Sequence, residues 1–153
     1  MLTANDQDAV GTDLSSVTAN SVTSDVVATA LEFSTEPVPL TVESGVSTSF
    51  MTVPVVRAVD GNGLSDTGYS TTITLSEVNG AGSATMTGTG DTDGNSATVS
   101  LTPSSGVATF TGLAVTYTQS GGSNETFNLQ ASSGGLTAAT SSQLTTSDTT
   151  SHT

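Results

Sequence analysis

Acidic and amide side chains, which could bind calcium, gather in two glycine-containing stretches. In one of them, Asp91, Asp93 and Asn95 stand at the first, third and fifth positions of a calcium-binding loop. A calcium loop normally supplies a bidentate glutamate from its twelfth position, which is Thr102 in this chain. The alternative interpretation is that these side chains cap a turn through hydrogen bonds to the backbone.

Asp60, Asn62 and Asp66 form a looser second set of candidate calcium ligands. Asp6 and Asp8, near the N-terminus, are a third candidate. Turn capping also explains the second set, because Asp and Asn favour turns. We therefore expect no obligatory cofactor and keep Ca²⁺ as the candidate ion.

Residues with catalytic chemistry are scarce. Asp66, Thr67 and Gly68 match the tripeptide of aspartic proteases, but that chemistry needs two carboxylates that share a proton. The sequence has a single histidine, His152, in a polar tail, and it has no cysteine and no lysine. Disulfides, thiolate metal sites and lysine cross-links are therefore excluded, and histidine-dependent catalysis is disfavoured. We expect no enzymatic activity and assign no catalytic residue.

The charge balance restricts the partners. One Lys or Arg stands against 14 Asp or Glu, so the formal net charge is −13. Nucleic acids and anionic membrane surfaces attract basic proteins, so neither is an expected partner. The apolar runs are only a few residues long, so we expect no membrane insertion. Ser and Thr make up more than a third of the chain, a composition common in extracellular bacterial repeat proteins.

Apolar residues alternate with polar ones in many short stretches, which predicts β-strands rather than helices. Turn-forming residues recur at intervals of about ten residues. About seven or eight strands at this spacing indicate an all-β, antiparallel sandwich with an immunoglobulin-like, Greek-key topology over residues 26–148. A bend is expected at Pro54. The alternation predicts a buried core made of Leu31, Phe33, Ile73, Leu75, Val99, Leu101, Phe110, Leu113, Phe127 and Leu129.

The N-terminal residues 1–25 resemble the C-terminal part of the chain. Val22-Thr-Ser-Asp25, for example, is similar to Leu144-Thr-Thr-Ser-Asp148. We interpret residues 1–25 as the terminal hairpin of a preceding repeat or as a strand donated to a neighbour, with a ladder from Leu14 to Val22 to a partner outside the sandwich. Residues 149–153 are then the linker to the next repeat.

Four segments, taken together, carry a family resemblance that extends over about Leu31 to Leu144. In this order they resemble the bacterial immunoglobulin-like (Big-type) tandem repeats of large secreted or cell-surface proteins. The resemblance implies an extracellular, adhesin-like or stalk-like parent protein without catalytic residues. The segments are Leu31–Pro37, Pro54–Gly63, Gly106–Leu113 and Leu129–Ser141.

These observations predict a non-catalytic structural repeat of an extracellular bacterial surface or fibre protein. It would act as a spacer or adhesion module through strand pairing and end-to-end packing with neighbouring repeats. One alternative is a subunit of a self-assembling filament, joined to identical subunits by donated strands. Another is a module that binds a surface glycan or a host protein through loops at one end.

Overall fold

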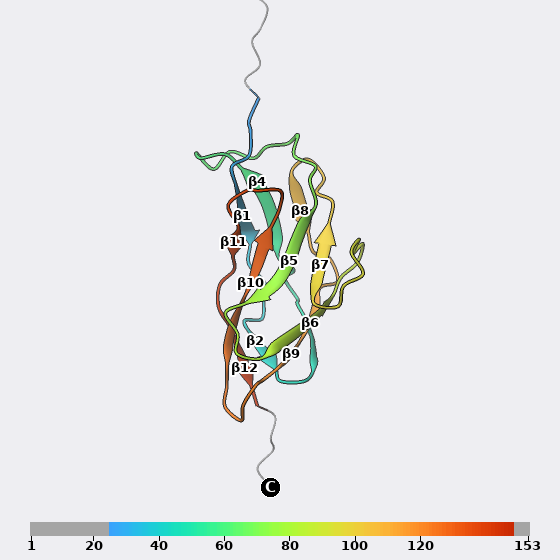
Figure 1. Ribbon diagram of the computed structural model, residues 1–153, viewed down its shortest axis with the longest axis vertical. Helices are drawn as coiled ribbons and strands as arrows, with labels where there is room; N and C mark the ends of the chain where they lie inside the picture. The colour runs from blue at the N-terminus through green and yellow to red at the C-terminus, as the bar shows by residue number, and fades with distance from the viewer. Residues whose placement is uncertain (1–24, 149–153) are drawn as a thin grey trace, which may run out of the picture.

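Short β-strands joined by tight turns make up the described part of the chain, residues 25–148 of the computed structural model (Figure 1). Across these residues there is no helix, and therefore none long and apolar enough to cross a bilayer. The twelve strands are β1 (Ala30–Thr35), β2 (Thr41–Glu43), β3 (Ser47–Ser49), β4 (Val55–Val59), β5 (Ile73–Val78), β6 (Ser83–Thr87), β7 (Thr98–Leu101), β8 (Val107–Thr109), β9 (Ala114–Thr118), β10 (Thr126–Ser132), β11 (Ala139–Thr140) and β12 (Leu144–Ser147).

One layer of the fold consists of two three-stranded sheets, with strand orders β1-β4-β8 and β3-β9-β6. They are consecutive halves of the same layer, because the chain runs from β3 directly to β4 and from β8 directly to β9. Residues 50–54 separate the first pair, so the run of sequence is interrupted up to Pro54, while the bend predicted there stays a prediction. Pro54 lacks a backbone N–H, but its carbonyl accepts the N–H of Phe110 at 3.1 Å and so keeps the two strands together.

The second layer has the strand order β2-β12-β10-β5-β7, and β11 also pairs with β10. Its ladders are antiparallel except for the pairing of β2 with β12, which is parallel. The predicted all-β antiparallel sandwich is therefore confirmed, and its immunoglobulin-like Greek-key topology stays a prediction. There are more strands than predicted because breaks divide single runs of sequence, as between β3 and β4. The segments predicted at 1–25 and 149–153 lie outside the described residues, apart from Asp25.

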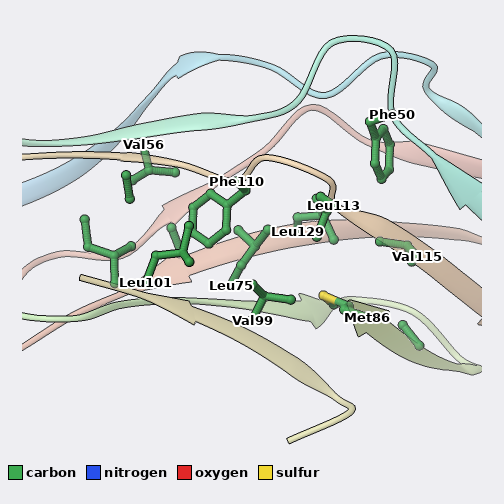
Figure 2. Close-up of a cluster of buried hydrophobic side chains, with 14 of the residues drawn as sticks. Phe50, Val56, Leu75, Met86, Val99, Leu101, Phe110, Leu113, Val115 and Leu129 are labelled. Atoms are coloured by element: carbon green, nitrogen blue, oxygen red, sulfur yellow. The ribbon is translucent and has the colours of Figure 1, made fainter. Parts of the chain in front are cut away.

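The core lies between the two layers. Figure 2 shows Phe110 from one layer pointing toward Leu75 and Leu129 from the other, and all three side chains are fully buried. Nine of the ten residues predicted for the core are buried. The exception is Phe33, which packs against the core but is partly exposed. Phe33 lies on the edge strand β1, where the register with β4 shifts between Phe33 and Thr35.

A stacked aromatic pair joins the layers near one end of the sandwich. The rings of Tyr117 on β9 and Phe127 on β10 have centroids 4.3 Å apart and an interplanar angle of 7°. Both side chains are fully buried, so the pair contributes apolar area as well as ring contact. Phe127, which was predicted to belong to the core, is therefore found there.

The position of a phenylalanine within this core determines how much it contributes to stability. We expect Phe110→Ala to lower the free energy of unfolding by about 3–5 kcal/mol, because it leaves a cavity between the layers. Phe33→Ala should cost no more than about 2 kcal/mol, because its ring already contacts solvent. Urea denaturation of both variants measures these losses. Equal losses would contradict the assignment of Phe33 to the rim of the core.

Candidate functional site

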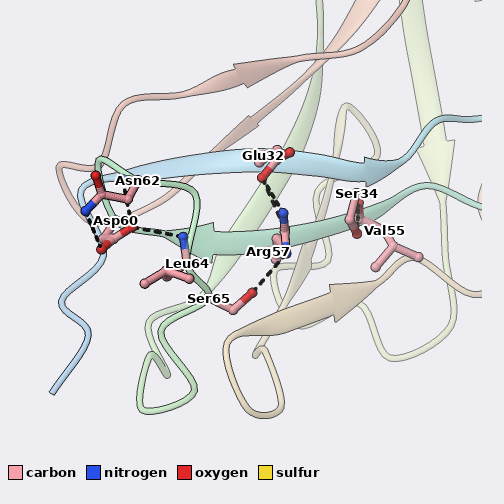
Figure 3. Close-up of polar contacts among 8 residues, drawn as sticks. All are labelled: Glu32, Ser34, Val55, Arg57, Asp60, Asn62, Leu64 and Ser65. Carbon is pink, nitrogen blue, oxygen red and sulfur yellow. Dashed lines mark hydrogen bonds and ion pairs between the residues drawn. The ribbon is translucent and has the colours of Figure 1, made fainter. Parts of the chain in front are cut away.

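The first Asp-rich turn is organised around one carboxylate. Oδ1 of Asp60 accepts the backbone N–H groups of Asn62 and Leu64, each at 2.9 Å, and the Asn62 amide lies 3.5 Å from Oδ2 (Figure 3). These hydrogen bonds, that from Leu64 foremost, hold the pKa of Asp60 below its usual value. The turn therefore uses Asp60 as a cap, as the alternative interpretation of this stretch predicted.

Asp66 fastens the beginning of the sandwich to this turn region. Its Oδ2 accepts the backbone N–H of Ala28 at 3.0 Å, and its Oδ1 accepts that of Gly68 at 2.9 Å. The backbone carbonyl of Asp66 packs directly against Gly106, whose φ of 75° and lack of a side chain permit the approach. Asp66 thus ties three separate segments together at the end of the molecule where residue 25 lies. We call this end the N-terminal pole.

The second Asp-rich stretch lies in the loop between β6 and β7 and covers the outer edge of β7. Oδ1 of Asp91 accepts the backbone N–H of Ser100 at 2.9 Å, and the N–H of Thr92 donates to the carbonyl of Ser100, also at 2.9 Å. The loop thereby supplies the hydrogen bonds that a neighbouring strand would otherwise make. An uncovered strand edge invites pairing with other chains, so this loop protects β7 from association.

Asp93 and Asn95 complete the same loop. Oδ2 of Asp93 accepts the hydroxyls of Ser100 at 2.6 Å and Thr98 at 2.8 Å, while Oδ1 accepts the N–H of Asn95 at 2.7 Å. These bonds, with the Ser100 hydroxyl first, lower the pKa of Asp93. The side-chain oxygen of Asn95 accepts the N–H of Ala97 at 3.0 Å. The loop is therefore held by its own carboxylates.

The geometry of both stretches favours turn capping over calcium binding. Oxygens of every predicted ligand except Asn62 already accept hydrogen bonds from the protein. Across the part of the chain that the structure describes, no three His, Cys, Asp or Glu side chains come together as a metal site. Calcium prefers several convergent oxygens, and in both stretches the carboxylate oxygens already serve as acceptors for the turns. The calcium sites proposed from the sequence at Asp91, Asp93 and Asn95, and at Asp60, Asn62 and Asp66, stay predictions.

Arg57, the single basic residue in the sequence, pairs across the sheet. Its Nε and Nη2 donate to Oε2 of Glu32 at 3.1 and 2.9 Å, and its Nη1 donates to Ser65 at 3.3 Å (Figure 3). Glu32 and Arg57 are partners in the β1–β4 ladder. Both side chains are partly exposed, so the ion pair contributes little to stability. Its main consequence is that the positive charge of Arg57 is already paired.

The protease-like tripeptide takes part in turn capping. Both carboxylate oxygens of Asp66, in the protease-like tripeptide, accept backbone N–H groups as described above. His152 lies outside the described residues. The aromatic residues Tyr117, Phe110 and Phe127 are buried and form no exposed platform for a sugar ring.

A hydrogen-bonded latch at the opposite end of the molecule, the C-terminal pole near residue 148, was not anticipated from the sequence. The Tyr117 hydroxyl donates to Oε2 of Glu125 at 2.9 Å and accepts the N–H of Gly82 at 2.8 Å. The Cβ of any larger residue at Gly82 would collide with the carbonyl of Thr118. Tyr117 thus joins the β5–β6 turn to the loop before β10. The signal for such a latch is a tyrosine in a core strand, because a buried phenol needs a polar partner.

Glu125 forms the other half of the latch. Its Oε1 accepts the hydroxyl and N–H of Ser120 at 2.7 and 2.8 Å and the N–H of Gly121 at 3.1 Å. These donors, with the Ser120 hydroxyl first, lower the pKa of Glu125. Burial, in turn, raises the pKa of Tyr117 and keeps its proton available for donation.

Removing the phenol oxygen tests the latch. We expect Tyr117→Phe to lower the free energy of unfolding by about 1–3 kcal/mol, because Gly82 loses its acceptor while the ring stays in place. Thermal and urea denaturation measure the loss. Tyr69→Phe is the matched comparison, since its hydroxyl bonds Ser133 in a partly exposed setting. A loss from Tyr117→Phe no larger than that from Tyr69→Phe would contradict the latch.

The lowered pKa of Glu125 gives the latch a pH dependence of defined sign. A carboxylate whose pKa is lowered by folding stabilises the fold above its unfolded pKa of about 4.3, and loses that contribution as the pH falls through the folded pKa. Wild type should therefore exceed Glu125→Gln in stability at pH 7, and the gap should close in acid. Glu43→Gln is the control, because the Glu43 carboxylate accepts no hydrogen bond from the described residues. A gap independent of pH would refute the assignment.

Comparison with known proteins adds no assignment to this geometry. The sequence matches no protein-family model, and a search of curated proteins finds no significant match. The resemblance to bacterial immunoglobulin-like repeats therefore rests on the four sequence segments alone and stays a prediction.

Proposed function

We propose that this chain is a non-catalytic structural repeat of an extracellular bacterial surface or fibre protein, serving as a spacer in a stalk. The observation that carries the proposal is the path of the chain. Residue 25 lies at one end of the long axis of the sandwich and residue 148 at the other (Figure 1). Repeats joined through such ends extend in a line, whereas ends at the same pole would fold neighbours back on each other.

The terminal strands are oriented so that the sandwich can resist force applied at both of its ends. β1 starts from the N-terminal pole and β12 ends toward the C-terminal pole, each running along the long axis (Figure 1). A pull on the two ends therefore slides each strand along its neighbours and loads its ladder hydrogen bonds together. Peeling, in contrast, would break them one at a time. The chain has no disulfide, so these ladders carry the load.

Strand β12 is held on both sides. It pairs with β10 on one side and in parallel with β2 on the other, where the N–H of Thr145 donates to Leu40 at 2.8 Å and that of Ser44 to Ser147 at 3.0 Å. This pairing connects the beginning of the sandwich directly to its end. Force that reaches β12 thus passes to β2 without crossing the whole fold.

The fully buried Thr146 anchors the same strand through its side chain. Its Oγ1 accepts the backbone N–H of Glu125 at 2.7 Å and the side-chain amide of Gln119 at 2.5 Å. The backbone N–H of Thr146 also donates to the carbonyl of Glu125 at 2.8 Å. β12 is therefore attached to the latch at the C-terminal pole as well as to its ladders.

The acidic surface is compatible with end-to-end packing and opposes lateral association. The chain carries 14 acidic residues, and its single basic residue is already paired with Glu32. Repeats lying side by side would bring like charges together over a long contact. The repulsion reaches about 8 Å at physiological salt, so it acts on close lateral contacts and spares joints that touch only at the poles.

Single-molecule pulling between the two termini tests the proposal. We expect Thr146→Val to lower the unfolding force, because the isosteric change leaves the N–H of Glu125 without its acceptor. Thr145→Val is the matched control on the same strand, where the side chain makes no hydrogen bond with the described residues. Wild type should unfold in one step.

Two outcomes would contradict a load-bearing role. One is wild-type unfolding by gradual peeling at forces near the instrumental baseline. The other is an equal drop in unfolding force for Thr146→Val and Thr145→Val, since this would mean that β12 is not the loaded element.

A further inference from the structure

The outer edge of β3 carries backbone groups without partners. β3 pairs with β9 on its other side, and just past the strand the N–H of Phe50 donates to Leu113 at 3.3 Å. Because donors alternate along an antiparallel strand, the backbone of Thr48 faces β9, whereas that of Ser47 and that of Ser49 face away. The outward N–H and C=O groups of Ser47 and Ser49 have no hydrogen-bond partner within residues 25–148. Two donors and two acceptors therefore point outward from this strand.

The edge is open because the chain that covers its continuation turns away. β1 lies beside β4, and beyond β1 the backbones of Val38 and Thr52 exchange hydrogen bonds at 3.0 and 3.2 Å. After Val38 the chain crosses to the other layer, where β2 pairs with β12. Across the described residues, no strand is thus left to lie beside β3.

Other edges of the sandwich are covered by the chain itself. Beside β1, the carbonyl of Thr137 accepts the N–H of Leu31 at 2.8 Å. On β8, Val107 exchanges two backbone hydrogen bonds with Ser104 at 2.9 and 3.0 Å, and the loop that contains Asp91 covers β7. An open edge in a fold that covers these others is a place where a further strand can pair.

The sheet that ends in this edge is free of charge. None of the residues of β3, β9 or β6 is charged, although the chain carries a net charge of −13. The side chains of Ser47 and Ser49 are exposed, and the charged residue that precedes them in the sequence is Glu43, four positions before Ser47. Two acidic copies can therefore meet at β3 without bringing carboxylates of these strands together.

We propose that β3 pairs in antiparallel fashion with β3 of a second copy, about a two-fold axis at Thr48. The segment Ser47-Thr48-Ser49 reads the same in both directions, so each copy offers the edge that the other needs. Ser47 of each copy then exchanges both backbone hydrogen bonds with Ser49 of the other, which pairs every outward donor and acceptor. One position further along, Val46, which is 44% exposed, comes opposite Phe50 of the second copy.

A second copy satisfies this edge more completely than an unrelated peptide does. Pairing of two copies joins two three-stranded sheets into one and leaves neither β3 open, whereas a peptide would bring an uncovered edge of its own. The contact is short and neutral, so it is compatible with repulsion between the acidic parts of the surface. Neighbouring stalks and isolated chains would both use it, so this pairing and the spacer function can fail separately.

The absence of cysteine from the sequence permits a direct cross-linking test on the full chain. Thr48 lies in a non-hydrogen-bonded pair of the proposed ladder, where the two Cα atoms are about 4.5 Å apart and a disulfide can form. Thr85→Cys, at an exposed threonine on β6 of the same sheet, is the matched control. Under mild oxidation we expect Thr48→Cys to dimerise at least about tenfold faster than the control, because pairing raises the effective concentration of the thiols. Equal rates would overturn the proposal.

A mixing experiment tests the register. A Ser47→Cys chain is oxidised together with an isotope-labelled Ser49→Cys chain, and the three possible dimers are measured by mass. The mixed disulfide should exceed its statistical share, because Ser47 lies opposite Ser49 in the antiparallel register. A statistical mixture, or an excess of the two dimers of like chains, would contradict this pairing.

Hydrogen exchange of the unmodified chain provides a second readout. The amides of Ser47 and Ser49 should exchange rapidly in dilute protein and at least about fivefold more slowly at concentrations where copies associate, because they then gain acceptors. The amide of Thr48 already faces β9 and serves as the internal control. Unchanged exchange at Ser47 and Ser49 up to millimolar protein would overturn the proposal, even if the chain associates by another surface.

Discussion

Strand β12 lies between β10 and β2 near the C-terminal pole, and this three-strand arrangement joins an early strand of the chain to its last strand (Figure 1). The parallel ladder with β2 joins the first part of the described chain to its last strand. Val42, Leu144 and Thr146 bury their side chains at this point, so the ladder is also part of the core. Without it, the layer that contains β10 and β5 would end in an exposed edge at β12. The attachment of the last strand to the C-terminal pole depends on this pairing.

Hydrogen bonds accepted by Asp, Glu and Thr side chains hold together a chain that has no covalent cross-links. There is no disulfide, and within residues 25–148 one ion pair is formed, by Arg57 with Glu32. Asp60 and Asp66 cap turns at the N-terminal pole, whereas Glu125 and Thr146 hold loops and strands at the C-terminal pole. No buried side-chain N or O atom among the described residues lacks a partner. Because these buried polar atoms are all hydrogen-bonded, a core with few aromatic residues can still specify a single folded structure.

Local patterns in the sequence predicted the features that depend on neighbouring residues. Alternation predicted burial because side chains of a strand point to opposite faces, and this holds for Ile73, Leu75, Phe127 and Leu129. The strand interruption that ends at Pro54 is consistent with its missing N–H. Phe33 departs from the pattern because its exposure depends on a register shift against β4, which local alternation does not contain.

The roles of the polar residues depended on contacts between distant segments, and the sequence could not reveal them. Asp91 and Asp93 stand in a recognisable turn, but their partner Ser100 is defined only once β7 takes its place in the sheet. Tyr117 alternates with Val115 in an apolar run, yet its hydroxyl accepts the N–H of Gly82, which is 35 residues away in the sequence. Spacing suggested calcium at these aspartates, whereas the folded chain supplies N–H and hydroxyl donors to the same oxygens.

The central claim is that the sandwich is built to be joined end to end, because its chain passes from one pole to the other. Small-angle scattering of tandem chains with increasing numbers of copies tests this most directly. The account predicts that the radius of gyration increases nearly in proportion to copy number, as for a stiff rod. Growth with an exponent of about 0.5, as for a flexible chain, would contradict it.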